Sequence, residues 1–410
     1  MKKFNLLVSC SLIASLMLGT MCTTDKSSKQ ENANAHWVGT WGTAVQLTEP
    51  HNNPPQPGIS GNTLRQKVRV SVGGDALRLK LSNEFGNEPI KIKAINIATA
   101  LDSSQVDTTT FTGILFNGKP NVEIPVGESL TSDATKFSLA PRQDVAITIA
   151  YDYVPSNITG HPGSRTTSYI LEGDAALRQA NFANAVKTDH WYTIERIDVI
   201  APEKSAAIAI IGNSITDGRG STTNMQNRWT DVFADRLQAN PATSHLAVLN
   251  MGIGGNLVVD GHGGLGPAAS ARFCRDAINQ PGVKYVIIYE GVNDIGYSEN
   301  LALTEKELIS ALSNMIDTAH SCGLTVYGGT IAPFKESFYY SPEKEVCRIN
   351  VNKWIRTCGK YDAVIDIEKA ICSRSDTTIM NENWHDNDHL HPNAEGHRQI
   401  GSFVDLKLFE

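Results

Sequence analysis

The feature that most constrains the fold is a change of hydrophobic pattern close to residue 203. Between His36 and Pro202, short runs of alternating apolar and polar residues are separated by glycine, proline and asparagine. Such runs predict many short strands, so we expect residues 36–202 to form an all-β sandwich or jelly roll. From Ser205 onward, apolar strands alternate with amphipathic helices, which predicts an α/β domain over residues 203–410. A length of 410 residues suits two domains of these sizes.

The apolar run Ala206–Gly212 has turn residues on both sides, as expected for a strand buried on both faces of a parallel sheet. We predict further strands at His245–Asn250, Tyr285–Glu290, Leu324–Thr330 and Ala363–Asp366. We predict helices at Asn227–Gln238, Pro267–Asn279, Thr304–Cys322, Pro342–Cys358 and Ala394–Leu406. Because ligands of such sheets bind at the carboxyl ends of the strands, the loops after these strands should carry the chemistry.

The N-terminus has the pattern of a targeting signal. Two lysines precede the apolar run 4–21, and a polar stretch follows it. We therefore predict a signal peptide over residues 1–22, a flexible tether over residues 23–35, and export to the periplasm or the cell surface. Cys22 at the end of the apolar run favours a lipid anchor in the membrane, whereas the Ala-Asn-Ala sequence at 33–35 offers an ordinary cleavage site.

Charge and cysteine content exclude some classes of protein. The formal net charge is −7 and there is no long run of lysine or arginine, so we expect no nucleic-acid partner. Five cysteines follow residue 35, at Cys274, Cys322, Cys347, Cys358 and Cys372. An odd number leaves at least one cysteine without an intramolecular partner, and the lack of a Cys-x-x-Cys pair argues against a structural zinc site.

Four polar or glycine-rich segments carry the candidate chemistry, namely Gly212–Gly218, Asn250–Asn256, Glu290–Asp294 and His385–Asn393. Ser214 in the first can act as a nucleophile beside a general base, or it can be an ordinary turn or N-cap serine. The glycines of the second can offer backbone N–H groups to an oxyanion, and they do not form the G-x-G-x-x-G of a phosphate loop. Asn293 in the third can direct its amide at a developing charge, or it can serve only in a turn.

The fourth segment combines carboxylates with imidazoles. Asp388 and His391 are three residues apart, so the carboxylate can hold the imidazole in the tautomer that accepts a serine proton. Asp386 and His389 have the same spacing and form an alternative pair. The same side chains, together with His385, are metal-ligand types, so a metallohydrolase is an alternative class.

Together the four segments resemble the SGNH (GDSL-type) hydrolase family, from Ala206 to the C-terminus. The resemblance implies a flavodoxin-like three-layer α/β fold and a serine ester hydrolase that needs no metal or cofactor. It implies Ser214 as the nucleophile and the pair Asp388 and His391 as its partners, because His391-Pro392-Asn393 continues as the family does.

The resemblance also implies an oxyanion hole. Its donors would be the N–H groups of Ser214 and Gly255, with Gly254 as the alternative glycine, and the side chain of Asn293. One position departs from the family, because Asn213 stands where an aspartate is usual.

The first half resembles the β-rich region that precedes the catalytic domain in some secreted members of the family. The resemblance rests on Trp37–Trp41, Leu64–Gln66 and Leu81–Gly86. We also expect the loop Gly160–Tyr169 to border the active site.

These features favour a carbohydrate O-acetyl esterase, whose substrate is a glycan or small-molecule ester. A lipase or lysophospholipase is the alternative enzyme, although no apolar lid helix is visible in the sequence. A different class is a non-catalytic carbohydrate-binding protein, in which the β sandwich binds sugar beside a silent site. The presence of Ser214, Asn293, Asp388 and His391 argues against that class.

Overall fold

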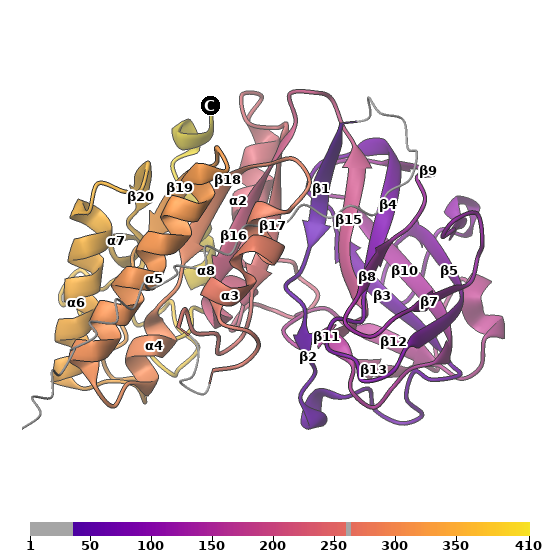
Figure 1. The fold of residues 1–410 in the computed structure, drawn as a ribbon, viewed down its shortest axis with the longest axis horizontal. Coiled ribbons are helices and arrows are strands. Elements are labelled where there is room, and N and C mark those ends of the chain that lie inside the picture. The colour runs from indigo at the N-terminus through magenta and orange to yellow at the C-terminus, as the bar shows by residue number, and fades with distance from the viewer. Residues whose placement is uncertain (1–35, 260–263) are drawn as a thin grey trace, which may run out of the picture.

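The computed structural model describes residues 36–259 and 264–410, in which a β-rich region lies beside an α/β domain (Figure 1). The predicted signal peptide, tether and Cys22 anchor fall outside the described residues. No helix within the described ranges is both long and apolar enough to cross a membrane.

The β-rich region contains two larger antiparallel sheets. One has the order β13-β12-β3-β10-β5-β6 with β7 beside β5, and the other has the order β1-β15-β4-β8 with β9 beside β4. Apolar side chains of both sheets belong to one buried cluster, which includes Leu79 of β4 and Ile147 of β10. The all-β prediction for this half is therefore confirmed.

The strands of the first sheet are β3 (Thr63–Arg69), β5 (Ile90–Thr99), β6 (Thr112–Ile114), β7 (Val122–Ile124), β10 (Asp144–Tyr153), β12 (Ser168–Leu171) and β13 (Val186–Thr188). Those of the second are β1 (Trp37–Gly42), β4 (Gly74–Ser82), β8 (Ser129–Thr131), β9 (Thr135–Leu139) and β15 (Ile194–Ile200). A third small sheet, which the sequence pattern did not predict, consists of β2 (Gln46–Leu47), β11 (Thr159–His161) and β14 (Trp191–Tyr192).

The α/β domain contains a five-stranded parallel sheet with the order β17-β16-β18-β19-β20. Its strands are β16 (Ala206–Gly212), β17 (Leu246–Gly252), β18 (Val283–Tyr289), β19 (Thr325–Gly329) and β20 (Ala363–Ile365). This is the flavodoxin-like strand order, and all five strands lie close to their predicted positions. Successive residues of β16 point to opposite faces, so Ile208 and Ile211 belong to two different buried clusters.

Helices cover both faces of this sheet, as predicted. They are α1 (Ser214–Asp217), α2 (Trp229–Ala239), α3 (Ala269–Phe273), α4 (Val292–Tyr297), α5 (Leu301–Ser321), α6 (Pro342–Thr357), α7 (Ile367–Ile371) and α8 (Ala394–Phe403). The short helices α1, α4 and α7 were not predicted, and α5 begins three residues before the predicted Thr304. Two further differences concern α3 and α8. The segment expected at Pro267–Asn279 is α3 followed by a π-helical turn at Cys274–Ile278, and α8 ends three residues before Leu406.

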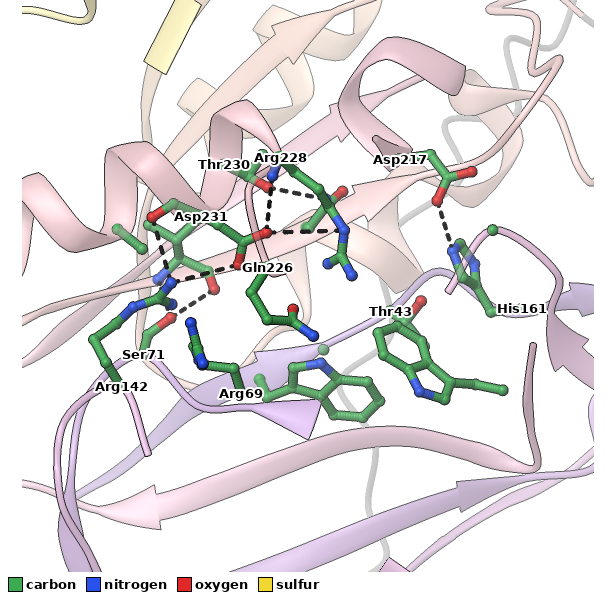
Figure 2. A pocket seen from close by; sticks show the side chains of 17 residues that line it. Thr43, Arg69, Ser71, Arg142, His161, Asp217, Gln226, Arg228, Thr230 and Asp231 are labelled. Carbon is green, nitrogen blue, oxygen red and sulfur yellow. Dashed lines mark hydrogen bonds and ion pairs between the residues drawn. The ribbon is translucent and has the colours of Figure 1, made fainter. Parts of the chain in front are cut away.

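A polar pocket lies where the β-rich region meets α2 (Figure 2). Arginines from both parts of the chain line it, and each pairs with a carboxylate: Arg69 with Asp144, Arg142 with Asp235, and Arg228 with Asp231. Ser214, Asp388 and His391 do not line this pocket, so it is separate from the candidate catalytic side chains.

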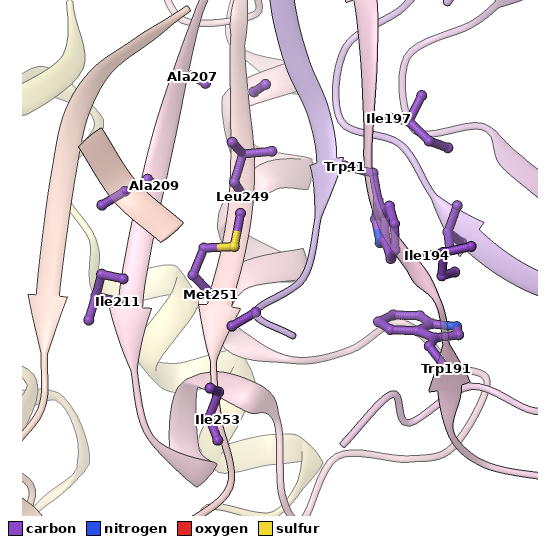
Figure 3. Packing of buried hydrophobic residues seen from close by; sticks show 14 of the residues in the cluster. Trp41, Trp191, Ile194, Ile197, Ala207, Ala209, Ile211, Leu249, Met251 and Ile253 are labelled. Atoms are coloured by element: carbon purple, nitrogen blue, oxygen red, sulfur yellow. The ribbon is translucent and has the colours of Figure 1, made fainter. Parts of the chain in front are cut away.

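Apolar packing joins the two parts of the chain into one core (Figure 3). Leu249 and Met251 of β17 belong to the same buried cluster as Trp41 of β1 and Trp191 of β14. The hydroxyl of Ser71 also donates to the carbonyl of Val248 and accepts from its N–H group, at 3.0 and 3.1 Å. The β-rich region therefore covers the β17 side of the parallel sheet.

Candidate active site

The predicted nucleophile and its partners lie in one hydrogen-bonded chain at the carboxyl ends of the strands. The Oγ atom of Ser214 lies 2.8 Å from Nε2 of His391, and Nδ1 of His391 lies 2.6 Å from Oδ2 of Asp388. The other oxygen of Asp388 accepts the backbone N–H groups of Leu390 and His391. Burial raises the pKa of Asp388, but these hydrogen bonds outweigh burial and hold its pKa well below the usual range.

The structure favours the first of the two Asp-x-x-His registers. His389 directs Nδ1 toward a carboxylate oxygen of Glu336 at 3.4 Å, and its ring lies tilted against that of His385 with 4.2 Å between centroids. The metal-site alternative gains no support, because the part of the chain that the structure describes holds no group of three ligand-type side chains arranged around a cation site. Cys322, Cys347, Cys358 and Cys372 are free thiols, in keeping with the odd cysteine count.

The turn that carries Ser214 follows directly from the end of β16. Asn213 is extended, and its Oδ1 atom accepts the N–H group of Ile215, which caps the short helix α1. Ser214 is the first residue of that helix and only 6% exposed. The strand, the cap and the buried environment therefore hold the hydroxyl in one position.

Asn293 is held by hydrogen bonds at both ends of its amide. Its Nδ2 group donates to the carbonyl of Asn256 at 2.8 Å, and its Oδ1 atom accepts from the hydroxyl of Tyr339 at 3.0 Å. These partners determine which end of the Asn293 amide is the oxygen and which is the nitrogen. The second hydrogen of Nδ2 can therefore be donated to a ligand. Gly255, the predicted glycine donor, has a φ of +68° in the turn just before Asn256.

The sequence interpretation missed Arg272, which links the segments around this site. Its guanidinium donates to the carbonyls of Gly212 and Met251, and to the side chain of Asn256. The side chain is 2% exposed and pairs with Asp276 at 2.9 Å. One buried cation therefore ties together the ends of β16 and β17 and the glycine-rich loop.

The contact with Glu290 accounts for an asparagine, rather than an aspartate, at position 213. The Nδ2 group of Asn213 donates to Oε2 of Glu290 at 3.0 Å, and the N–H group of Gly291 donates to the same oxygen. Burial raises the pKa of Glu290 to about 8, although the charge of Arg272 opposes the rise. An aspartate at position 213 would set a second carboxylate against this one, so the amide is the side chain that fits.

The β-rich region contributes directly to the nucleophile turn. Nε2 of His161 lies 2.9 Å from Oδ1 of Asp217, the residue that ends α1, and Figure 2 shows this contact. Nδ1 of His161 faces the carbonyl of Ala44 at 2.8 Å. A Cβ atom at Gly163 would lie 1.9 Å from an oxygen of Asp217, so this close approach requires glycine. The loop Gly160–Tyr169 therefore does lie against the Ser214 turn.

We expect His161→Ala to destabilise the protein by about 2 kcal/mol, because the buried carboxylate of Asp217 would lose its hydrogen bond with the imidazole. We also expect kcat to fall, because Asp217 lies one helical turn from Ser214. Urea unfolding and ester hydrolysis measure the two effects. The control is His320→Ala, which removes the exposed pair of His320 with Asp362 and should change stability by less than about 1 kcal/mol. Equal stability of the two variants would contradict the proposed importance of His161.

The comparison with protein families agrees with this architecture. Residues 210–399 match the model of a family described as the GDSL-like lipase/acylhydrolase family. Comparison with curated proteins finds no match.

Several solved structures are similar to about half of the chain. A putative acylhydrolase from Bacteroides fragilis has 19% identity and a TM-score of 0.39, covering 51% of this chain and 89% of its own. Est24, a carbohydrate acetylesterase from Sinorhizobium meliloti, has 18% identity and a TM-score of 0.39, covering 50% of this chain and 99% of its own. A catalytic mutant of Axe2, an acetylxylan esterase from Geobacillus stearothermophilus, has 19% identity and a TM-score of 0.38, covering 49% of this chain and 94% of its own.

Proposed function

We propose that the protein is a carboxylic ester hydrolase that removes O-acetyl groups from carbohydrates, with Ser214 as its nucleophile. The match of residues 210–399 to the GDSL-like lipase/acylhydrolase family supports this proposal. The observation that carries this proposal is the hydrogen-bonded chain from Ser214 through His391 to Asp388. A serine hydroxyl is a weak nucleophile until an adjacent base can take its proton, and this chain supplies the base.

The reaction then follows from these positions. Nε2 of His391 takes the proton as Oγ of Ser214 attacks the ester carbonyl, while ionised Asp388 holds the imidazole and stabilises its charged form. The N–H groups of Ser214 and Gly255 and the free Nδ2 hydrogen of Asn293 receive the oxyanion. His391 returns the proton to the leaving alcohol, and an acyl-enzyme remains. Water, deprotonated by His391, then attacks the acyl carbonyl; the bond to Oγ of Ser214 breaks, acetate leaves, and His391 returns the proton to Oγ.

The surroundings of the site support a short acyl group on a polar alcohol. The loop that carries His391 exposes Asp386 and Asn387, and the neighbouring loop exposes Glu336. A long acyl chain gains binding free energy when it is enclosed by apolar surface, whereas these three side chains are polar and exposed. Hydroxyl groups of a sugar can instead form hydrogen bonds with them.

The test is a series of ethyl and p-nitrophenyl esters with acetyl, butyryl and octanoyl groups, together with O-acetylated oligosaccharides. We expect kcat/KM for acetyl to exceed that for octanoyl by at least about 100-fold, since each poorly accommodated methylene costs roughly 1 kcal/mol or more. A preference for octanoyl would support the lipase alternative. Glycan binding without turnover of any ester would support the carbohydrate-binding alternative.

A further inference from the structure

We propose that Tyr297 and Phe338 form a stacking subsite for a sugar ring of the acetylated glycan. The inference rests on the proposed function and specifies how the alcohol part of the substrate is held. Tyr297, Phe338 and the ring between them, Tyr339, are called the aromatic platform below.

The aromatic platform is attached to the candidate oxyanion hole. Tyr339 is 5% exposed, and its hydroxyl donates to Oδ1 of Asn293 at 3.0 Å. A Cβ atom at Gly296 would lie 2.5 Å from the Tyr339 ring, so this ring packs directly on the backbone of α4, the helix that carries Asn293. The central ring therefore has a fixed position beside the amide that we expect to bind the reacting carbonyl.

The two outer rings pack on the central one. The Phe338 and Tyr339 rings have centroids 4.4 Å apart, and the Tyr297 and Tyr339 rings have centroids 5.2 Å apart at an angle of 76°. Packing of this kind restricts the outer rings, so a ligand that stacks on them loses little side-chain entropy of the protein.

The same loop also reaches the segment that carries the general base. Glu336, two residues before Phe338, lies 3.4 Å from His389, two residues before His391. The aromatic platform is therefore connected on one side to Asn293 and on the other to the His391 loop. A molecule whose ester lies between Ser214 and Asn293 would extend across this neighbourhood.

The exposure of the outer rings points to a ligand. Phe338 is 72% exposed and Tyr297 is 49% exposed, although both rings are large and apolar. Glu299, Asn300 and Glu336, which lie within three residues of these rings along the chain, are polar and exposed. Large apolar rings left in water beside a polar rim are typical of binding surfaces.

A sugar ring suits this surface better than an acyl chain. A pyranose has an apolar C–H face, which can cover an aromatic ring, and hydroxyl groups at its edge, which stay in contact with water or with polar side chains. An acyl chain laid on open rings would leave much of its surface in water and would lose most of the free energy of burial. The observations therefore favour a glycan as the occupant.

The experiment compares Phe338→Ala and Tyr297→Ala with wild type on three substrates. They are an O-acetylated xylo-oligosaccharide, ethyl octanoate, and ethyl acetate, which has neither a ring nor a long chain. We expect Phe338→Ala to raise KM for the oligosaccharide about 5- to 10-fold, the range for loss of one aromatic contact, and to leave ethyl acetate hydrolysis unchanged. Phe338→Trp should restore the low KM. Phe403→Ala, which removes a 45% exposed ring on α8, is the matched control.

The outcomes separate this subsite from the proposed function. Oligosaccharide KM values in Phe338→Ala and Tyr297→Ala that match the Phe403→Ala control would overturn the subsite and leave the proposed function intact. A raised KM for octanoyl esters alone would assign the platform to acyl chains and overturn the glycan assignment. A wild-type enzyme that hydrolyses ethyl acetate but no acetylated oligosaccharide would overturn both the glycan substrate and the subsite.

Discussion

Ser214→Ala is expected to lower kcat/KM for p-nitrophenyl acetate by at least about 10⁴-fold, because no other group can form the acyl-enzyme. The fold should not change, since alanine fits the position of a small buried side chain in the first turn of α1. Ester hydrolysis under single-turnover and steady-state conditions measures the loss, and circular dichroism and thermal unfolding report on the fold.

The matched control is Ser321→Ala, an exposed serine at the end of α5. It should keep wild-type activity and stability. A Ser214→Ala protein that hydrolyses the ester as fast as this control would rule out Ser214 as the nucleophile, and the metal-dependent alternative would then be tested with chelators.

Asn213→Asp is expected to destabilise the folded protein by about 3 kcal/mol at pH 9, because two buried carboxylates would face each other near Ser214. In the wild type, the pKa of Glu290 is about 8 when folded, against an ordinary value of 4.5. The folded state therefore binds a proton that the unfolded state releases. The stability due to this proton is complete below pH 4.5 and is lost as pH rises through about 8. A second carboxylate raises the folded pKa further, so the variant should lose more stability over the same range.

Urea unfolding at pH 6, 7, 8 and 9 measures this effect. Glu290→Gln alone should flatten the pH dependence, because the titrating group is gone. When both substitutions are combined, the new amide at position 290 can donate to the new carboxylate at position 213, so the pair is restored with its donor and acceptor exchanged. If Asn213→Asp is as stable as wild type at pH 9, or if Glu290→Gln does not rescue it, the pairing of these two residues is not what selects asparagine at position 213.

Local sequence patterns were sufficient for the architecture and for much of the site. The strand Ala206–Gly212 could be predicted because a parallel strand covered on both faces is apolar at nearly every position. The loops that follow such strands meet at one edge of the sheet, which brings Ser214 and Asn293 to the same end. The fourth segment offered two Asp-x-x-His pairs with equal spacing, and the structure brings His391 rather than His389 to Ser214.

The residues that were missed act through contacts between distant segments. Arg272 lies in a helix with no motif, and its role depends on carbonyls at the ends of two strands. His161 comes from a three-residue strand, which is too short for sequence periodicity to reveal. Tyr339 follows a loop of no regular pattern, and only its hydrogen bond to Asn293 shows its importance. Such partners are set by tertiary packing, which spacing along the chain does not encode.

The attachment of the β-rich region to β17 limits how far this enzyme can be reduced in size. β17 pairs with β16 on one side only, and Ser71 of the β-rich region forms hydrogen bonds with the N–H group and the carbonyl of Val248 in β17. A shortened enzyme starting at residue 203 would present an open strand edge to other molecules, a known route to aggregation, and would lose the imidazole that meets Asp217. Attempts to engineer a minimal biocatalyst from this chain should therefore keep residues 36–202 or replace them with a partner that covers the same edge.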